Sequence, residues 1–283
     1  MKIVVFLVKV LTIFCYSTQI TVKSIPPTNE VIPIKNRNFD IRENNFALHP
    51  SIYMGKFEYK ETERTCNSNI PLQISSVVSD KIYPRNPKKY VSPMNSLTCL
   101  DDNFDCFHDY VELAHLEKDF QELVDIYNTK GGQYFENYPY SFDDQFKFPT
   151  CKEFTNEINE LTTHTLEIVK YEKEDFEYFK YEIFNKGSML AAFYAPRGFL
   201  SYIYGGIYTP DEGQEKVAYY LLRIIGWRDI TTKDKTTQQD VTKYYWIFGF
   251  TNDSGWGIGG YGMMEVGVGG FTYYNIEVKE KSS

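Results

Sequence analysis

The chain contains 283 residues, of which 42% are hydrophobic, and its formal net charge is −8 at pH 7. A chain of this length can bury a sizeable core as one two-lobed domain or as two domains. Its negative charge argues against non-specific binding to nucleic acid, because the phosphates would be repelled. Composition therefore indicates a globular protein and identifies no ligand.

The first residues have the pattern of a secretory signal peptide, which we place at residues 1–18. Lys2 supplies a positive charge, residues 3–14 are mostly apolar, and small or polar residues follow at 17–19. The apolar run is too short to anchor the chain, and no later segment approaches the length of a membrane helix. We therefore predict a protein without a membrane span, either secreted to the extracellular space or held in a lysosomal or other endomembrane lumen.

Cleavage of the signal peptide removes Cys15 and leaves four cysteines: Cys66, Cys99, Cys106 and Cys151. An even number of cysteines in a secreted chain predicts disulfides, here two. Four cysteines allow three pairings, and their number alone does not choose among them.

The next segments in the chain predict an arm and two helices. Residues 19–37 are rich in proline and polar residues and lack apolar periodicity, which predicts a short N-terminal arm. Residues 70–82 carry apolar side chains at helical spacing. Asn69 stands where a helix N-cap would, and Pro71 fits because it falls in the first turn. Residues 111–127 predict a second helix with one apolar face.

The second half of the chain follows a different pattern. A third helix is predicted at residues 176–185, ended by Gly187, and the interleaved charges of residues 152–182 indicate a solvated face. Short runs rich in β-branched and aromatic residues then alternate with Gly, Pro and Asp. They predict strands at residues 189–195, 219–227, 244–251, 261–268 and 272–278. Helices followed by strands predict an α+β fold of two lobes, with an antiparallel, barrel-like sheet in the second.

Six segments carry motifs in a fixed order. They are NFDIRE at 38–43, SPMNSLTCLDDNFDC at 92–106, ENYPY at 136–140, KGSMLAAFYAPRGFLSYIYGGIY at 186–208, LLRIIGW at 221–227 and YWIFGFTNDSGWGIGGYGMMEV at 245–266. Together they resemble the papain-like cysteine peptidases, especially cathepsins B and C. The resemblance implies a papain-like, two-lobed domain at residues 38–283. Its helical lobe, with the central helix, would span about 60–150 and its β-rich lobe about 151–283.

The resemblance also implies which cysteines pair. The family pattern maps onto Cys66–Cys106 and Cys99–Cys151, which uses every cysteine left after the signal peptide. By closing loops in the unfolded chain, each bridge would stabilise the fold by about 2–4 kcal/mol.

Peptide hydrolysis in this family needs a thiolate nucleophile, a His as base, an Asn that orients the His, and an oxyanion donor. The nucleophile position falls on Asn69, whose amide nitrogen is conjugated with its carbonyl and cannot attack a peptide. The base position falls on Tyr220, a poor proton acceptor at neutral pH because its ordinary pKa is about 10. The orienting position falls on Phe250, which has no hydrogen-bonding side-chain atom. The oxyanion position falls on Glu63, whose carboxylate would repel a developing negative charge.

A shifted alignment does not restore the catalytic histidine. The four histidines are His49, His108, His115 and His164, and none lies in the strand-rich stretch after residue 187. Loss of one triad member costs about 10⁶-fold in related catalysis. The sequence therefore predicts a catalytically degenerate member of the family.

The substrate cleft is expected to differ as well. After the cysteine at the position of Cys106 the family has glycines, whose bare backbone pairs with the substrate. Here His108 and Asp109 place side chains in that stretch. The arm at 19–37 is also too short for a typical inhibitory propeptide. Asn252 begins the one N-glycosylation sequon and is a candidate for modification.

The sequence assigns no metal and no cofactor. The acidic loop around Asp101, Asp102 and Asp105 could be drawn as a metal site, but its spacing matches no recognised ligand pattern, so a solvated loop is favoured. Residues 255–260 satisfy G-x-G-x-x-G, but a predicted strand follows them where a dinucleotide site needs a helix.

The sequence therefore predicts a secreted papain-like pseudopeptidase that acts by binding a protein or peptide ligand. Two alternatives stay open. The chain could be a residual hydrolase that uses unorthodox residues such as Tyr220 and Glu63, or a structural or matrix component. No motif names the partner.

Overall fold

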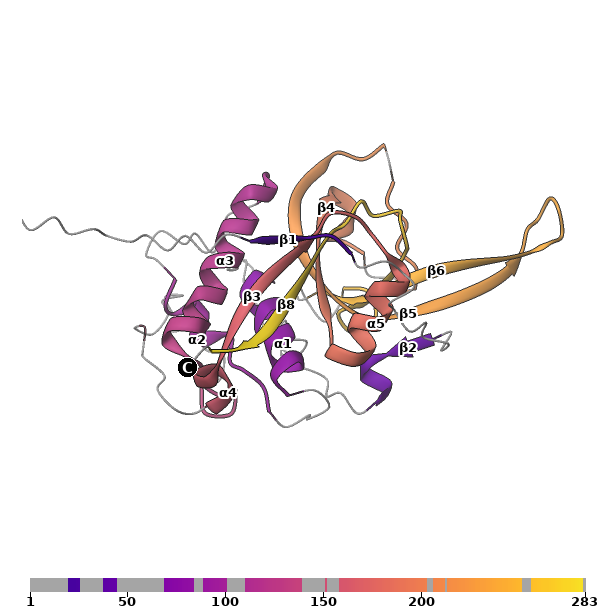
Figure 1. Ribbon diagram of the computed structural model, residues 1–283. Helices are drawn as coiled ribbons and strands as arrows, with labels where there is room; N and C mark the ends of the chain where they lie inside the picture. Colours follow the sequence, from indigo (N-terminus) through magenta and orange to yellow (C-terminus); the bar gives the residue numbers. More distant parts are fainter. Residues whose placement is uncertain are drawn as a thin grey trace, which may run out of the picture.

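A computed structural model describes residues 20–25, 38–44, 69–83, 89–100, 110–138, 151, 158–202, 206–211, 213–250 and 256–281 of the protein. Helices from the first half of the chain lie beside a sheet built mainly from the second half (Figure 1). The fold is therefore of the α+β class, as the order of the elements predicted. Within these ranges, no helix is long and apolar enough to cross a membrane.

The helices predicted from the sequence are present with slightly shifted ends. The described helices are α1 (Asn69–Ile82), α2 (Met94–Leu97), α3 (Leu113–Lys130), α4 (Asn159–Thr163) and α5 (Phe176–Lys186), with 3-10 helices at Ile41–Asn44 and Arg197–Phe199. The side chain of Asp175 caps α5 by accepting a hydrogen bond from the Tyr178 backbone N–H at 3.0 Å. Gly187 ends α5 with a φ of +89°, a conformation that glycine adopts without strain.

The described strands form one eight-stranded sheet. They are β1 (Thr21–Lys23), β2 (Asn38–Asp40), β3 (His164–Tyr171), β4 (Met189–Pro196), β5 (Lys216–Lys233), β6 (Asp240–Gly249), β7 (Tyr261–Glu265) and β8 (Thr272–Glu280). Their order is β1-β3-β8-β4-β5-β6-β7, and β2 pairs with β5 beside this path. The pairings are antiparallel except that of β1 with β3, which is parallel. All five strands predicted after Gly187 are confirmed.

The sheet separates two apolar cores. Along β4, Leu190 and Ala192 pack into a core shared with α1 and α3, whereas Ala191 and Phe193 pack into a core shared with α5 and β6. Successive side chains of a strand point to opposite faces, so a strand that is buried on both faces needs apolar residues throughout. This accounts for the unbroken apolar run of β4.

The strand β2 approaches β5 at a glycine. Phe39 pairs with Trp227 and Asp40 with Gly226. A Cβ atom on Gly226 would lie 2.0 Å from the Phe39 carbonyl oxygen, so no other residue fits at this position. The contact ties the segment that begins at Asn38 to β5, an inner strand of the sheet.

The prediction of a solvated face at residues 152–182 is wrong in part. This stretch contains β3, whose residues Leu166, Ile168 and Val169 are buried. Glu182 is 1% exposed and accepts hydrogen bonds from Lys186 at 2.7 Å and Asn275 at 2.9 Å. Charged residues can be buried here because each has a partner in the fold.

The strands β5 and β6 continue as a hairpin that projects from the body of the protein (Figure 1). From Thr231 to Tyr244 nearly all of its side chains are exposed. The hydroxyls of Thr231 and Thr242 hydrogen-bond across the two strands at 2.9 Å. At the tip, Asp234 accepts hydrogen bonds from the backbone N–H groups of Thr236 and Thr237.

Candidate active site

The first turn of α1 lies beside the end of β6. The helix begins at Asn69, the residue at the expected nucleophile position, and its N-terminus carries the positive end of the helix dipole. One turn further, the Gln73 side chain donates a hydrogen bond to the Gly249 carbonyl oxygen at 3.1 Å. Gly249 precedes Phe250, the residue at the expected orienting position. The fold thus brings these two sequence positions to the same region.

The expected base and orienting positions are in direct contact. Tyr220 lies on β5 and Phe250 follows β6, and their rings meet edge-on with 5.4 Å between centroids. Tyr220 is 6% exposed and Phe250 is 2% exposed. The Phe250 backbone N–H donates to the Gly260 carbonyl oxygen at 2.8 Å. This bond holds the Phe250 backbone in place although β6 ends one residue earlier, at Gly249.

Further aromatic rings surround this pair. The Phe199 ring lies 5.0 Å from that of Phe250 and 6.4 Å from that of Tyr220, and the Trp256 ring lies 5.1 Å from that of Phe250. The Trp256 indole N–H is satisfied by the Phe199 carbonyl oxygen at 2.6 Å. We call the whole set the aromatic cluster, and it comprises Phe193, Phe199, Tyr202, Tyr208, Tyr220, Phe250 and Trp256.

The aromatic cluster is an unfavourable place for charge. Burial raises the pKa of Tyr208 to about 12, with a smaller contribution from Asp211, and burial also raises the pKa of Tyr202. A cysteine peptidase works through a thiolate and an imidazolium, and both are stabilised by polar or charged surroundings. Of the cluster, only the tyrosine hydroxyls and the already bonded indole of Trp256 could offer a side-chain hydrogen bond.

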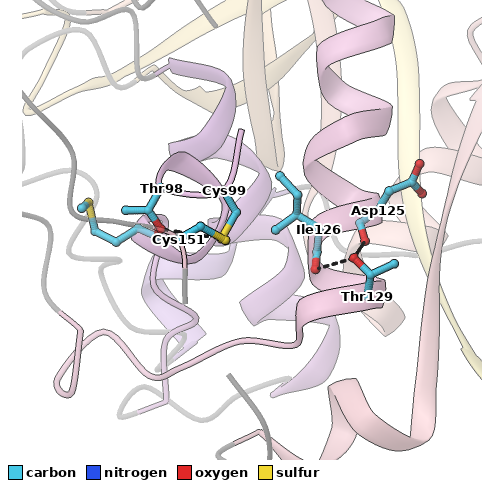
Figure 2. Close-up of a disulfide and its surroundings, with 7 residues drawn as sticks. Thr98, Cys99, Asp125, Ile126, Thr129 and Cys151 are labelled. Atoms are coloured by element: carbon cyan, nitrogen blue, oxygen red, sulfur yellow. Dashed lines mark hydrogen bonds between the residues drawn. A yellow bond between two sulfur atoms is a disulfide. The ribbon is translucent and has the colours of Figure 1, made fainter. Parts of the chain in front are cut away.

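The disulfide predicted between Cys99 and Cys151 is confirmed. Their sulfur atoms are bonded at 1.98 Å, and Figure 2 shows the bond beside Thr98. The Thr98 hydroxyl lies 3.8 Å from the Cys99 sulfur (Figure 2). A disulfide sulfur is not a thiolate, so neither cysteine is available as a nucleophile.

Several predicted site residues lie outside the described ranges. They are Glu63 at the oxyanion position, Cys66 and Cys106 of the second predicted bridge, His108 and Asp109 of the altered cleft, and the sequon residue Asn252. Their predicted roles stay predictions. In the part of the chain that the structure describes, no group of three or more His, Cys, Asp or Glu side chains is arranged to hold a metal ion.

The two described histidines lie on α3 and at the start of β3 and are not members of the aromatic cluster. His115 is on α3 with a side chain 59% exposed, 3.9 Å from the carboxylate of Glu112. His164 opens β3, and its Nδ1 lies 2.8 Å from the Thr163 hydroxyl. Neither belongs to the contacts described for Tyr220 or Phe250.

Sequence reasoning missed a buried polar group next to this site. Arg223 of β5 donates through Nη2 to Asp80 of α1 at 2.7 Å and through Nε to the Ser188 hydroxyl at 3.0 Å. Ser188 also donates to Asp80. Arg223 and Asp80 are 4% and 6% exposed. The available signal was the arginine inside the apolar run LLRIIGW, because a buried arginine needs an acidic partner.

Several solved structures with a similar fold are described as procathepsins or proenzymes. The chain is similar to proCathepsin B S9 from Trypanosoma congolense, with a TM-score of 0.59 and 16% identity over 94% of this chain and 84% of that one. It is similar to procathepsin L 3 from the larval midgut of Tenebrio molitor, with a TM-score of 0.56 and 15% identity over 92% of this chain and 76% of that one. It is also similar to the SERA5 proenzyme of Plasmodium falciparum, with a TM-score of 0.58 and 15% identity over 90% of this chain and 70% of that one. At these identities the likeness concerns the fold.

No curated protein matches the sequence. The model of a family described as papain family cysteine protease matches residues 66–281, which is most of the chain. This range includes α1, every described strand after β2, and the positions of Tyr220 and Phe250. The chain therefore belongs to the papain family of cysteine proteases.

Proposed function

We propose that this protein is a secreted papain-family pseudopeptidase, which has lost proteolysis and acts by binding a protein or peptide. The observation that carries the proposal is the edge-on contact of Tyr220 and Phe250, both nearly fully buried. A catalytic base must reach the nucleophile and must be oriented by a hydrogen-bonding neighbour. A phenyl ring cannot orient a base, and a phenol at neutral pH keeps its proton.

The nucleophile is the second part of the argument. Asn69 opens α1, where a thiolate would gain from the helix dipole. Cys99 and Cys151 are joined to each other, so they cannot substitute for it. Cys66 and Cys106 are proposed to form the second bridge, and Cys15 falls in the proposed signal peptide. Under this assignment the mature chain carries no free thiol.

Secretion and a luminal or extracellular location are part of the same proposal. They are supported by the signal-peptide pattern at residues 1–18 and by the Cys99–Cys151 disulfide, a bond that persists in oxidising compartments. We propose the arm at 19–37 and the domain at 38–283 as the parts of the mature chain.

An activity assay on the purified chain tests the loss of catalysis. We expect no cleavage of dipeptide-coumarin substrates and no labelling by a thiol-directed epoxide inhibitor, under conditions in which an active papain-family enzyme reacts with both. Cleavage by the chain would overturn the proposal. If that cleavage were lost in Tyr220→Phe or Glu63→Gln, the residual-hydrolase alternative would take its place.

A restoration experiment tests the assignment of the three positions. The triple variant Asn69→Cys, Tyr220→His, Phe250→Asn is compared with the single variant Asn69→Cys, in which the new thiol has no base. We expect epoxide labelling at position 69 to be faster in the triple variant, because a neighbouring imidazole raises the thiolate fraction. Equal rates in two folded variants would show that Tyr220 and Phe250 do not stand at the catalytic positions.

A further inference from the structure

A main-chain contact joins the segment that leads into α3 directly to β5. Tyr110 pairs antiparallel with Tyr219, and the Tyr219 backbone N–H donates to the Tyr110 carbonyl oxygen at 2.7 Å. Tyr110 comes from the part of the chain that carries the helices, and Tyr219 comes from the first part of β5. We call this contact the Tyr110–Tyr219 bridge, and it links the two halves of the fold through backbone atoms.

Side chains hold both residues of the bridge in place. The Tyr110 ring is buried in the core shared with α1 and α3, and its hydroxyl donates to Asp119 of α3 at 2.7 Å. The Tyr219 ring packs against the same core and stacks on the ring of Tyr194 of β4, with 4.5 Å between centroids and 12° between planes. The bridge is thus anchored to a helix on one side and to a strand on the other.

The pairing of β5 with β4 does not use the Tyr219 N–H. Residues that face each other in an antiparallel pair of strands alternate between exchanging two main-chain hydrogen bonds and exchanging none. Tyr219 faces Tyr194 of β4, but its N–H points to Tyr110, so this pair is of the kind without hydrogen bonds. Without the bridge, this edge of β5 would offer the N–H to another extended strand.

Under the proposed assignment, both residues of the bridge lie at the substrate cleft. Tyr219 directly precedes Tyr220, the proposed base position, and Tyr110 directly follows Asp109, one of the two cleft residues predicted from the sequence. A peptide that is to be cleaved must reach the base. It must also pair with the stretch that ends at Asp109, as the resemblance to the family implies. The two segments that meet in the bridge are therefore the two walls between which a substrate would lie.

The bridge leaves no room for a peptide between these walls. Neighbouring strands in a sheet lie about 4.8 Å apart. An extended peptide that pairs with both walls therefore needs them about 9.5 Å apart at that level. Tyr110 and Tyr219 are hydrogen-bonded to each other, so their backbones have the spacing of neighbouring strands, about half of what a peptide requires. The main chain of the protein itself occupies the place of the substrate.

We infer that the Tyr110–Tyr219 bridge is an autoinhibitory contact, which closes the substrate cleft to extended peptides. The Tyr110 carbonyl oxygen accepts the hydrogen bond that β5 would otherwise donate to a bound peptide. The inference rests on the proposed function, because that proposal places Tyr220 and Asp109 at the cleft. It adds a second obstacle to proteolysis beside the replaced catalytic residues, and it means that a protein or peptide partner binds elsewhere on the surface.

The Tyr219 amide reports directly on the bridge. In the unmodified chain labelled with nitrogen-15 tyrosine, its NMR signal is identified as the one that disappears in Tyr219→Phe, a change that keeps the stacked ring. We expect its hydrogen exchange to be slowed by about 100-fold or more relative to the unfolded chain. We also expect its signal to stay in place when a dipeptide-coumarin substrate is added at about 1 mM, a concentration that reveals even weak binding.

Variants of the Tyr110 anchor test whether the bridge is held as described. Tyr110→Phe and Asp119→Ala each remove the hydrogen bond between the Tyr110 hydroxyl and α3. Exchange of the Tyr219 amide should become about fivefold faster in both, because the carbonyl group that protects it is held less firmly. Asp125→Ala is the matched control, because Asp125 lies on the same helix and accepts a hydrogen bond from Gln121. This control should leave the exchange of the Tyr219 amide unchanged.

Two results would overturn the inference. The first is exchange of the Tyr219 amide at the rate of the unfolded chain in a folded protein, which would show that the walls are not paired. The second is a shift of its signal on addition of the substrate while the substrate stays intact, which would show that the cleft admits peptides although catalysis is lost. Cleavage of the substrate is a distinguishable outcome, because it would overturn the proposed function and with it the positions on which the inference rests.

Discussion

The ring of Phe250 meets the ring of Tyr220 edge-on, with 5.4 Å between the two centroids. These are the two residues that we propose for the orienting and base positions of the papain family. The contact joins the residue after β6 to the first part of β5, and the rings of Phe199 and Trp256 lie beside the pair. Edge-to-face pairs of this kind stabilise a core beyond the area that they bury, by about 0.5–1.5 kcal/mol. Tyr220 and Phe250 are thus part of the apolar core.

This packing predicts that Phe250→Asn, the change toward the catalytic residue, destabilises the protein. The change removes a buried ring and introduces an amide without partners, and we expect a loss of about 3–5 kcal/mol in the free energy of unfolding. Phe250→Leu keeps the site apolar and should cost clearly less, about 1–2 kcal/mol. Urea denaturation of both variants provides the measurement. Equal losses would mean that Phe250 is not in an apolar environment.

The buried pair of Arg223 and Asp80 gives a second prediction. Removing one partner leaves a buried charge without its counterpart, so Arg223→Met and Asp80→Asn should each lose about 3–5 kcal/mol of unfolding free energy. The double variant should lose less than the sum, because both charges are then gone. Ser188→Ala, which removes only a hydroxyl from the group, should cost about 1 kcal/mol. Additive losses in the double variant would show that the two residues do not interact.

Much of the fold could be predicted because its strongest patterns have a simple physical origin. The run of β4 is apolar throughout because both of its faces are buried, and α5 is bounded by a capping aspartate and a glycine with positive φ. The strand β3 was missed because Glu167 and Lys170 lie among its apolar residues. In the structure these charges have partners, Lys279 for Glu167 and Glu117 for Lys170. Local sequence does not contain those partners.

In the candidate site, too, the features set by the local sequence could be predicted, and those that depend on distant segments could not. Motif order predicts that positions 220 and 250 belong to the site, and the residue types there argue against catalysis. Their burial could not be predicted, because the surrounding rings come from separate segments: Phe199 follows β4, and Trp256 precedes β7. The group of Asp80, Ser188 and Arg223 was missed for the same reason, since it joins α1, the start of β4 and β5.

The cysteines give a third prediction, which concerns the pairing outside the described residues. Cys99 is bonded to Cys151. With the proposed signal peptide and its Cys15 removed, Cys66 and Cys106 are the pair that remains. We expect non-reducing peptide mapping, with cleavage after Phe104 to separate Cys99 from Cys106, to recover Cys66 linked to Cys106. Alkylation of either cysteine in the unreduced, unfolded protein would contradict this pairing. Loss of the bridge should cost about 2–4 kcal/mol of unfolding free energy.

The fourth prediction concerns the dependence of stability on pH. Burial lowers the pKa of Lys81 from 10.5 to about 8, although the carboxylates of Glu182 and Asp80 raise it in part. Its ammonium donates to the Gly187 carbonyl oxygen at 3.2 Å, at the junction of α1 and α5. The unfolded chain therefore binds a proton more tightly than the folded chain does between these two pH values. By linkage, the contribution of Lys81 to stability is complete above pH 10.5 and is lost as the pH falls to about 8.

The measurement compares Lys81→Met with the unmodified protein, because buried tyrosines also affect stability in alkali. Burial raises the pKa of Tyr261 to about 12, and such tyrosines lower stability as the pH rises above the ordinary value of 10. These tyrosines are present in both proteins, so their effect cancels in the difference. We expect the free energy of unfolding of the unmodified protein, minus that of Lys81→Met, to increase as the pH rises from 8 to about 10. Lys118→Met, on the exposed face of α3, is the matched control and should follow the unmodified protein across this range. A difference that stays constant with pH would mean that Lys81 titrates alike in the folded and unfolded chains, and that the junction of α1 and α5 does not disfavour its charge.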